Sequence, residues 1–355
     1  MQGGRLNLTV EGKNTISMGA TGGASTVKVT THAADADSIR FAGGSGNVSL
    51  MAQRVEGTRI YKDDPSDTEP TKHTQYGVVN DGKWTIDNLT GLTSEIYEDL
   101  NANDKRDIED FYGFATNPYS HINAYLWAFD NPVCAIDSEG NISVVIHTPK
   151  MAQILEKLVK ITSEYTGTYY DPSYTSKTNL GAHGGPVDLF RSGNVIFANG
   201  LFEYAIYYFR EVDDFGIIPY PKWDEAQEKY QMMVDGGHAA EAVPMTCADT
   251  ERTGTILEAL NAETYKTVVP AYYEIALKVK YARDNESIQM LDMIMANRVF
   301  DFGYVYDNWN GASFWLQDLV KGKKTDFESY YAKNESKVLK YYQKVFDRFD
   351  EYANG

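Results

Sequence analysis

An acidic stretch between residues 99 and 110 carries side-chain oxygens at a regular spacing. With Asp99 as position 1, carboxylate or amide groups stand at positions 1, 3, 5, 9 and 12. Calcium prefers about six to eight oxygen ligands around a tight turn, and EF-hand loops supply them at this spacing, with a backbone carbonyl at position 7. The spacing therefore predicts a structural calcium ion. Its ligands would be Asp99, Asn101, Asn103, the carbonyl of Lys105, Asp107 and Asp110.

Two residues of this loop differ from the EF-hand pattern. Asp104 stands at position 6, where EF-hands have glycine, and Asp110 stands at position 12, where a glutamate binds through both oxygens. Aspartate adopts the left-handed backbone conformation more readily than most residues, so position 6 stays compatible with the turn. The alternative interpretation is a solvated acidic loop between a helix and a strand.

Aromatic residues form the second group that could bind a ligand. A neutral sugar has apolar C–H faces and a rim of hydroxyls, so its site combines flat aromatic side chains with polar groups. The candidate aromatic residues are Trp127, Phe202, Tyr204, Tyr304, Trp309 and Trp315, and the candidate polar partners are Asn199, Glu203, Asp307, Asn308 and Asn310. The alternative for about half of the aromatic residues is the hydrophobic core, and Phe300, Phe302 and Phe314 are expected there.

The sequence lacks the patterns of common catalytic sites. The six histidines are scattered without zinc-ligand spacing, and neither a Gly-x-Ser-x-Gly elbow nor a phosphate loop is present. Aspartate and glutamate together number 50, so a glycosidase pair stays open. We expect a binding protein and no enzyme. The alternatives are a carbohydrate-active enzyme or an appended glycan-binding or adhesion module.

Charge and cysteine content narrow the class of protein. The net charge of −17 disfavours nucleic acid and anionic membranes as partners. No apolar run approaches the roughly 20 residues that a membrane span needs, and neither a signal peptide nor a lipid-bearing cysteine is visible near Met1. Cys134 and Cys247 have no adjacent redox or metal motif, so both are expected to be buried as small apolar residues.

The central element predicted to position the ligand-binding residues is residues 194–223. Val195 to Ala198 is a short apolar run between two glycines, which is typical of a strand covered on both faces. Asn199 follows it directly, then a short aromatic helix, and a second short strand is expected near residues 216–218. Ligands of open α/β sheets bind at the carboxyl ends of strands. Asn199 is therefore predicted at the base of a pocket that Trp309 shares with Trp127, Phe202 or Trp315.

Periodicity predicts further elements of an α/β region over residues 83–355. The expected helices cover residues 85–100, 122–129, 149–165, 249–261, 264–282, 287–297 and 326–352, and the expected strands cover 112–115 and 141–146. Residues 166–184 form a Gly-, Tyr- and Ser-rich loop whose length is typical of a functional loop.

The first part of the chain has a different pattern. Apolar and polar residues alternate over 6–10, 25–30 and 47–52, with Gly-rich turns between them. This predicts a small β-rich module over residues 1–61, similar to an immunoglobulin-like sandwich, with an ill-ordered segment as the alternative. No fixed-period repeat is apparent. Residues 62–82 combine charge, serine and proline, so a linker is expected.

Four stretches resemble bacterial extracellular solute-binding proteins, the carbohydrate-type receptors of ABC importers. The first is the apolar strand with its Asn199-Gly200 turn, aromatic helix and Gly216-Ile-Ile-Pro219-Tyr-Pro221. The others are Gly82-Lys-Trp84-Thr-Ile-Asp, then Ala242-Val-Pro244 with Glu251 to Leu260, and Arg298-Val-Phe300-Asp-Phe-Gly303. The resemblance covers roughly residues 80–355 and does not extend to residues 1–80.

The resemblance implies a fold and a function. The fold would be periplasmic-binding-protein-like (type II) α/β lobes that close around a ligand, with an incomplete N-terminal lobe. The function would be binding of an oligosaccharide by a non-catalytic, extracytoplasmic receptor of a lipoprotein family. An ABC permease would be its partner, and the receptor would be a monomer. The cleft between the lobes would be lined by Trp127, Asn199, Phe202, Glu203, Tyr204, Tyr304, Trp309 and Trp315.

Overall fold

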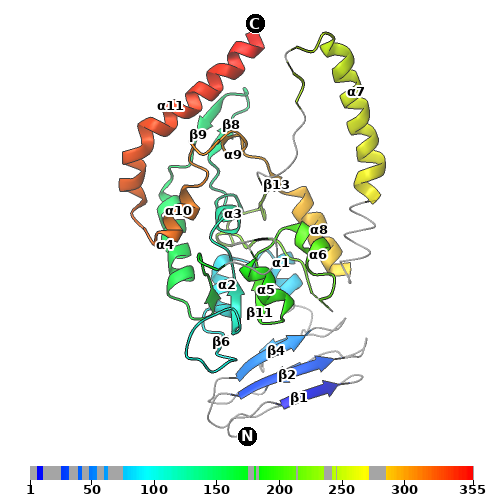
Figure 1. Ribbon diagram of the computed structural model, residues 1–355, viewed down its shortest axis with the longest axis vertical. Helices are drawn as coiled ribbons and strands as arrows, with labels where there is room; N and C mark the ends of the chain where they lie inside the picture. The colour runs from blue at the N-terminus through cyan, green and yellow to red at the C-terminus, as the bar shows by residue number, and fades with distance from the viewer. Residues whose placement is uncertain are drawn as a thin grey trace.

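A computed structural model describes most of the chain from Gln75 onward and five strands before it (Figure 1). The described residues are 6–10, 25–31, 39–41, 48–53, 60–62, 75–174, 180, 184–212, 215–235, 242–244, 246–271 and 285–354. Most of the linker predicted at 62–82, part of the loop 166–184 and the second half of the helix predicted at 264–282 lie outside these ranges. Architecturally, the described part is mixed α/β, with several small sheets and no barrel.

The three strands predicted near the N-terminus are present, but they pair differently from the prediction. The strands are β1 (Leu6–Val10), β2 (Ser25–Thr31), β3 (Ile39–Phe41), β4 (Val48–Gln53) and β5 (Ile60–Lys62). They form a three-stranded sheet in the order β1-β2-β4 and a separate β3-β5 pair, and every pairing is parallel. An immunoglobulin-like sandwich is antiparallel, so that prediction is wrong for these strands.

The register of these strands reveals a repeat in the sequence. Leu6 pairs with Val27, 21 residues later, and Ile39 pairs with Ile60, also 21 residues later. Ser25 pairs with Val48 at an offset of 23. Parallel strands at a nearly constant offset are the arrangement of stacked repeats. The expectation of no repeat is therefore corrected. The repeat is hard to see in the sequence because the coils share only a pattern of aliphatic residues.

The central sheet has four strands, and β7 (Phe111–Ala115) lies inside it. β10 (Thr168–Tyr169) and β11 (Val195–Ala198) pair with β7 in parallel, and β6 (Tyr97–Glu98) pairs with it antiparallel. All five residues of β7 are buried, whereas Ile196 of β11 is 38% exposed. The strand predicted at 195–198 is confirmed, but β7 and not β11 is the strand covered on both faces.

Helices cover both faces of this sheet. On one face, α5 (Gly185–Arg191) packs Leu189 against Tyr112 and Val195. On the other, Phe114 joins the main core, which is built largely from the following helices. They are α1 (Gln75–Asn80), α2 (Ile86–Thr93), α3 (Ser120–Ala128), α4 (Pro149–Ser163), α8 (Asn285–Ala296), α10 (Trp315–Lys321) and α11 (Phe327–Asn354). Helix α1 lies in the predicted linker and buries Tyr76 and Val79, so the α/β region begins at least as early as Gln75.

Local signals explain where several helices begin. The Thr85 hydroxyl accepts a hydrogen bond from the Asn88 backbone N–H at 3.2 Å, which caps α2. Thr148 caps α4 in the same way through Met151 at 3.1 Å, and Pro149 occupies the first turn, where its missing N–H costs nothing. These two helices follow the predicted ones with shifts of a few residues at their ends.

The second strand expected near residues 216–218 is absent from the structure. Residues 215–221 are extended without regular pairing, and Lys222 makes an isolated parallel bridge with Thr85. The Trp84 indole N–H donates to the Pro219 carbonyl at 2.9 Å, and the Lys222 N–H donates to the Trp84 carbonyl at 3.0 Å. Two of the stretches that carry the family resemblance therefore pack against each other.

The remaining elements form hairpins and short helices. β8 (Cys134–Ile136) and β9 (Ile142–Val144) are the predicted hairpin, β12 (Met232–Met233) pairs with β13 (Arg298–Val299), and α6 (Phe202–Tyr207) and α9 (Phe302–Val305) are short. Helix α7 (Thr250–Glu263), continued by a π-helical turn (Thr264–Val268), buries none of its residues and stands beside the body in Figure 1. Both cysteines are free; Cys134 is buried as predicted, but Cys247 is partly exposed.

Candidate functional site

Polar residues gather where the three parallel strands of the central sheet end. Thr116 and Asn117 follow β7, Tyr170 follows β10, and Asn199 follows β11. Parallel strands end at the same edge of a sheet, and the Asn199 N–H donates to the Ala115 carbonyl at 3.1 Å. We call these four polar residues the sheet-edge cluster. The prediction that Asn199 lies at a carboxyl edge is borne out by this pairing.

The sheet-edge cluster is enclosed by tyrosines and lies largely inside the protein. Asn199 accepts a hydrogen bond from the Tyr125 hydroxyl at 3.4 Å. Burial raises the pKa of Tyr125, so its hydroxyl stays protonated and can donate. Thr116 Oγ1, Asn117 Nδ2 and the Tyr170 hydroxyl are buried and have no hydrogen-bond partner among the described residues. Such buried groups are usually satisfied by ordered water or by a ligand.

The three residues predicted on α6 differ in their exposure. Tyr204 is 2% exposed, and its ring centroid lies 5.9 Å from that of His121. Phe202 is half-buried against the core, and Glu203 is exposed. Helix α6 thus directs its aromatic side chains inward, beside the sheet-edge cluster.

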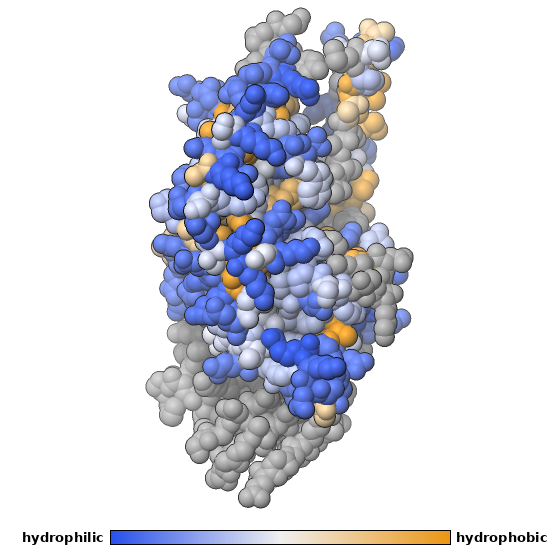
Figure 2. Space-filling view, turned by 60° about the vertical axis from the view of Figure 1, so that its left-hand side comes forward, coloured by the Kyte–Doolittle hydropathy of each residue, from blue (hydrophilic) through white to orange (hydrophobic). Residues whose placement is uncertain are grey.

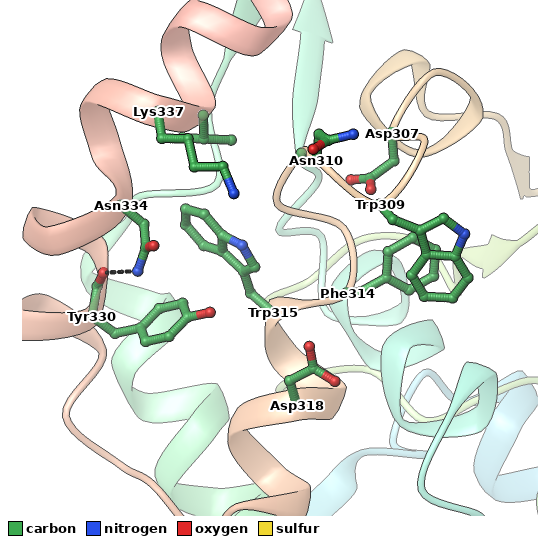
Figure 3. A pocket seen from close by; sticks show the side chains of 11 residues that line it. Asp307, Trp309, Asn310, Phe314, Trp315, Asp318, Tyr330, Asn334 and Lys337 are labelled. Carbon is green, nitrogen blue, oxygen red and sulfur yellow. Dashed lines mark hydrogen bonds between the residues drawn. The ribbon is translucent and has the colours of Figure 1, made fainter.

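A separate pocket of about 200 Å³ lies in the C-terminal part of the chain (Figure 3). It is formed by the loop before α10, by α10 and by the first half of α11. Its lining is Asp307, Trp309, Asn310, Gly311, Phe314, Trp315, Asp318, Tyr330, Asn334, Lys337 and Val338. We call it the C-terminal pocket. It combines four aromatic rings with two carboxylates, two amides and one ammonium group.

A strained turn holds Trp309 at the rim of the C-terminal pocket. The Asn310 N–H donates to the Asp307 carbonyl at 3.0 Å, and the two residues between have φ angles of 44° (Asn308) and 61° (Trp309). Positive φ at both central residues is the type I′ class, which favours Gly, Asn and Asp. Asn308 suits it, whereas a bulky tryptophan there is an outlier that costs on the order of 1–3 kcal/mol.

The Trp309 ring is 75% exposed and has one stacking partner among the described residues. Its centroid lies 4.1 Å from that of Phe314, with an interplanar angle of 15°. Phe314 therefore covers one face of the indole, and the other face is available to a ligand. The prediction that Phe314 belongs to the core is corrected, because Phe314 lines the pocket and supports Trp309.

Asp307 is the most deeply buried acidic group of the pocket. It is 1% exposed, and its Oδ2 accepts hydrogen bonds from the Ser313 N–H at 2.9 Å and the Tyr342 hydroxyl at 3.3 Å. Its Oδ1 is buried without a hydrogen-bond partner among the described residues. A bound molecule with a hydroxyl or amine would supply the missing donor after a small adjustment of the pocket wall.

The opposite wall comes from α10 and α11. Trp315 meets Tyr330 edge to face at 5.3 Å between centroids, and Figure 3 shows it between α11 and the 307–311 loop. The Asn334 amide nitrogen donates to the Tyr330 carbonyl at 2.8 Å, which leaves the amide oxygen as an acceptor. Partial burial raises the pKa of the Asp318 carboxyl above its usual range. This wall can therefore both accept and donate hydrogen bonds.

Sequence reasoning missed this wall, although a signal for it exists. Residues 330, 334 and 337 stand four and three positions apart, which places them on one face of a helix. The signal could not be used alone, because many triplets in a helix of 28 residues have this spacing and only packing selects one.

Trp127 and Tyr304 lie in the interior behind the pocket. Trp127 is 1% exposed, and its indole N–H donates to Asp301 Oδ2 at 2.7 Å. Its ring lies 4.9 Å from that of Tyr304, which in turn lies 5.8 Å from Phe314. An aromatic row thus leads from the core to Trp309. A ligand-stacking role for Trp127 does not fit this burial.

The structure divides the predicted ligand-binding residues between two places. Trp309 and Trp315 line one pocket, as predicted, but Asn199, Phe202 and Tyr204 are not part of its lining. The expectation of a single pocket with Asn199 at its base is therefore corrected. The physical reason is that Asn199 belongs to the end of β11, whereas both tryptophans belong to the α9–α10 segment.

The acidic loop at 99–110 folds around its own side chains. Asp99 accepts hydrogen bonds from the backbone N–H groups of Asn103 at 3.3 Å and Asp104 at 2.8 Å. The Asn103 amide reaches Asp107 at 2.8 Å, which helps to lower the pKa of the Asp107 carboxyl. Asp104 has a φ of 58°, the left-handed conformation that position 6 requires.

Asp110 and Arg106 join this loop to the sheet. Asp110 is fully buried and accepts from the Leu100 N–H at 3.3 Å and the Tyr97 hydroxyl at 3.0 Å. Arg106 donates to the carbonyls of Thr166 and Thr168, both at 2.7 Å. In the described ranges no group of three or more His, Cys, Asp and Glu side chains is arranged for a metal ion. A cation in this loop would therefore also need amide and backbone oxygens.

The surface and the comparisons complete the description of the site. Hydrophilic residues dominate the face seen in Figure 2. In the part of the chain that the structure describes, no helix has both the length and the apolar composition to cross a membrane. Comparisons with protein-family models, curated proteins and solved structures found no match.

Proposed function

We propose that this chain binds a carbohydrate without changing it chemically. The observation that carries the proposal is the C-terminal pocket, where aromatic rings and hydrogen-bonding groups of both kinds surround one small space. Sugar rings need both, because their C–H faces are apolar and their edges carry hydroxyls. Asp307 Oδ1 lacks a partner among the described residues, and a sugar hydroxyl would supply it.

The size of the pocket favours one sugar ring. Its volume of about 200 Å³ lies below the roughly 300–1,000 Å³ of pockets that enclose drug-sized ligands. A ring held there would meet the Trp315 edge and the acceptors Asn334 and Asp307. Lys337 and Asp318 bring opposite charges to the same rim, which suits a ligand without net charge.

The transport role follows from the resemblance in the sequence. We infer a non-catalytic, extracytoplasmic receptor of an ABC importer, with type II periplasmic-binding-protein-like lobes and a permease as partner. Support comes from the contact between two of the resembling stretches, where Trp84 donates to Pro219. The alternative is a glycosidase that uses Asp307 and Asp318, and release of products from an oligosaccharide would favour it.

Ligand screening by thermal shift tests the binding proposal. Glucose, galactose, mannose, xylose and their oligomers would be added to the protein, because a ligand selective for the native state raises the melting temperature. At least one sugar should raise it, and Trp315→Ala should remove the shift. Tyr265→Ala, an exposed aromatic on α7, serves as the control that keeps the shift. A panel without any effect would refute sugar binding.

We also propose that the 99–110 loop binds calcium. Support comes from the left-handed turn at Asp104 and from Asp99, Asn103 and Asp107, whose side chains contact the same turn of backbone or one another. The ligands would be Asp99, Asn101, Asn103, the Lys105 carbonyl, Asp107 and Asp110. The ion would stiffen the loop that Arg106 joins to β10 and would take no part in catalysis.

A further inference from the structure

The exposed Trp309 ring lies outside the space that one sugar would fill. Figure 3 shows the Trp309–Phe314 pair on the far side of the 307–311 loop from α11, while Trp315 lies between that loop and α11. The pocket therefore has two aromatic surfaces. The inner surface is Trp315 with Tyr330, and the outer surface is Trp309 on Phe314.

The outer surface is built at a cost to the backbone. Asn308 and Trp309 are both held at positive φ, and Gly311 lies so close to the pocket wall that a Cβ there would meet the Tyr342 hydroxyl at 2.2 Å. Burial of Trp309 does not compensate this strain, since its ring is 75% exposed. Strain that persists without a packing benefit is a feature of binding and catalytic sites.

We propose that the C-terminal pocket binds two consecutive rings of an oligosaccharide. This inference rests on the proposed sugar binding and extends it. The inner ring lies against Trp315 and hydrogen-bonds to Asp307 and Asn334, and the next ring stacks on the free face of Trp309. Phe314 positions the Trp309 indole and does not touch the ligand, because it covers the opposite face.

The geometry makes a statement about chain length. A third ring would extend beyond Trp309, and the pocket lining offers it no further aromatic side chain. Affinity should therefore rise from monosaccharide to disaccharide and then level off. One aromatic stacking contact corresponds to a gain of roughly tenfold in affinity.

Calorimetric titration of length series tests the inference. The probes are glucose, maltose and maltotriose; xylose, xylobiose and xylotriose; and mannose, mannobiose and mannotriose. In the series that binds, the disaccharide should bind about tenfold tighter than the monosaccharide and as tightly as the trisaccharide. Trp309→Ala should lower disaccharide affinity about tenfold and monosaccharide affinity less than twofold. Trp315→Ala should weaken both by similar factors.

The outcomes separate the inference from the proposed function. A disaccharide that binds no tighter than its monosaccharide, or an equal loss for both in Trp309→Ala, overturns the two-ring arrangement and leaves sugar binding intact. Absence of binding by every probe overturns the proposed function and this inference with it. Tyr265→Ala removes an equally exposed aromatic ring elsewhere and should change neither affinity.

Discussion

The sheet-edge cluster and the C-terminal pocket contain similar residue types but differ in what the protein does with them. At the sheet edge the polar groups of Thr116 and Asn117 are buried, and tyrosines surround them. In the pocket, Trp309 is exposed on a strained turn and Asp307 lacks one hydrogen-bond donor among the described residues. Exposure combined with strain distinguishes a surface that is kept for a ligand from polar groups that belong to the interior.

Helix α3 connects the two regions through consecutive turns. Tyr125 reaches Asn199 at the sheet edge, and Trp127, two residues later, leads through Tyr304 to the pocket. Residues two apart on a helix point in different directions, so one short helix supports both regions. A residue of α3 therefore provides the strongest way to disturb both at once.

The largest effect is expected for Trp127→Ala. Removal of this buried indole leaves a cavity and removes one hydrogen bond to Asp301, so the free energy of unfolding should fall by about 3–5 kcal/mol. Urea titration measures it. Trp309→Ala is the matched control, because an exposed tryptophan should change stability by only about 0.5 kcal/mol. Equal losses for the two variants would contradict the assignment of core and surface.

Calcium should stabilise the sheet-edge side of the molecule. At about 100 times its dissociation constant the ion would add about 2.7 kcal/mol to the free energy of unfolding, and Asp99→Ala should abolish this gain. Melting temperature with calcium and with chelator provides the measurement. Asp137→Ala removes a similar turn-stabilising carboxylate at the β8–β9 hairpin and should keep the calcium response. A response that survives in Asp99→Ala would argue against the site.

Gly311→Ala should damage the pocket alone. The added Cβ would meet the Tyr342 hydroxyl at 2.2 Å and Asp307 Oδ2 at 2.4 Å, so overpacking should cost about 1–3 kcal/mol and displace Asp307. Denaturation and sugar titration together check this. Gly91→Ala in α2 is the control, since its Cβ meets nothing within 4 Å, and it should leave sugar affinity unchanged. Unaltered affinity in Gly311→Ala would remove Asp307 from the site.

A smaller effect is expected for Asn199→Ala at the sheet edge. Loss of the acceptor for the Tyr125 hydroxyl should lower the free energy of unfolding by about 0.5–1.5 kcal/mol. Sugar affinity should stay within twofold of the unmodified protein, because Asn199 is not part of the pocket lining. Isothermal calorimetry decides between the two regions. A loss of affinity much beyond this would place the ligand at the sheet edge instead.

The smallest effect concerns pH in the absence of calcium. The Asn103 hydrogen bond lowers the folded-state pKa of Asp107 below 3.8. A lowered pKa stabilises the folded state above the unfolded pKa, and this contribution disappears as pH falls through the folded value. Asp107→Asn should therefore be less stable than the unmodified protein at pH 6, with a difference that shrinks toward pH 2. A difference independent of pH would assign the effect to packing.

Much of the local structure was predictable from contiguous residues. The run 195–198 is a strand, Thr148 and Pro149 begin a helix, and Asp104 adopts a left-handed turn within the acidic loop. Each of these features depends on interactions within a few residues of the chain. Such short-range preferences are written directly in the order of residue types.

Partners across the chain were not predictable in the same way. The alternating pattern of residues 6–10 and 25–31 predicts strands, but it is the same for parallel and antiparallel pairing. The structure decided for parallel pairing with offsets of 21 and 23 residues. Periodicity specifies which face of an element is apolar, and the energy of packing selects what covers it.

The functional site shows the same division between local and tertiary information. The sequence by itself determined that Trp309 stands in a polar turn and that Asp99 to Asp110 has calcium-loop spacing. Only the tertiary structure placed Trp127 in the core, separated Asn199 from Trp309 and brought Tyr330, Asn334 and Lys337 to the pocket. Residue type limits what a side chain can do, but its partners depend on contacts between distant segments, which form only when the whole core packs.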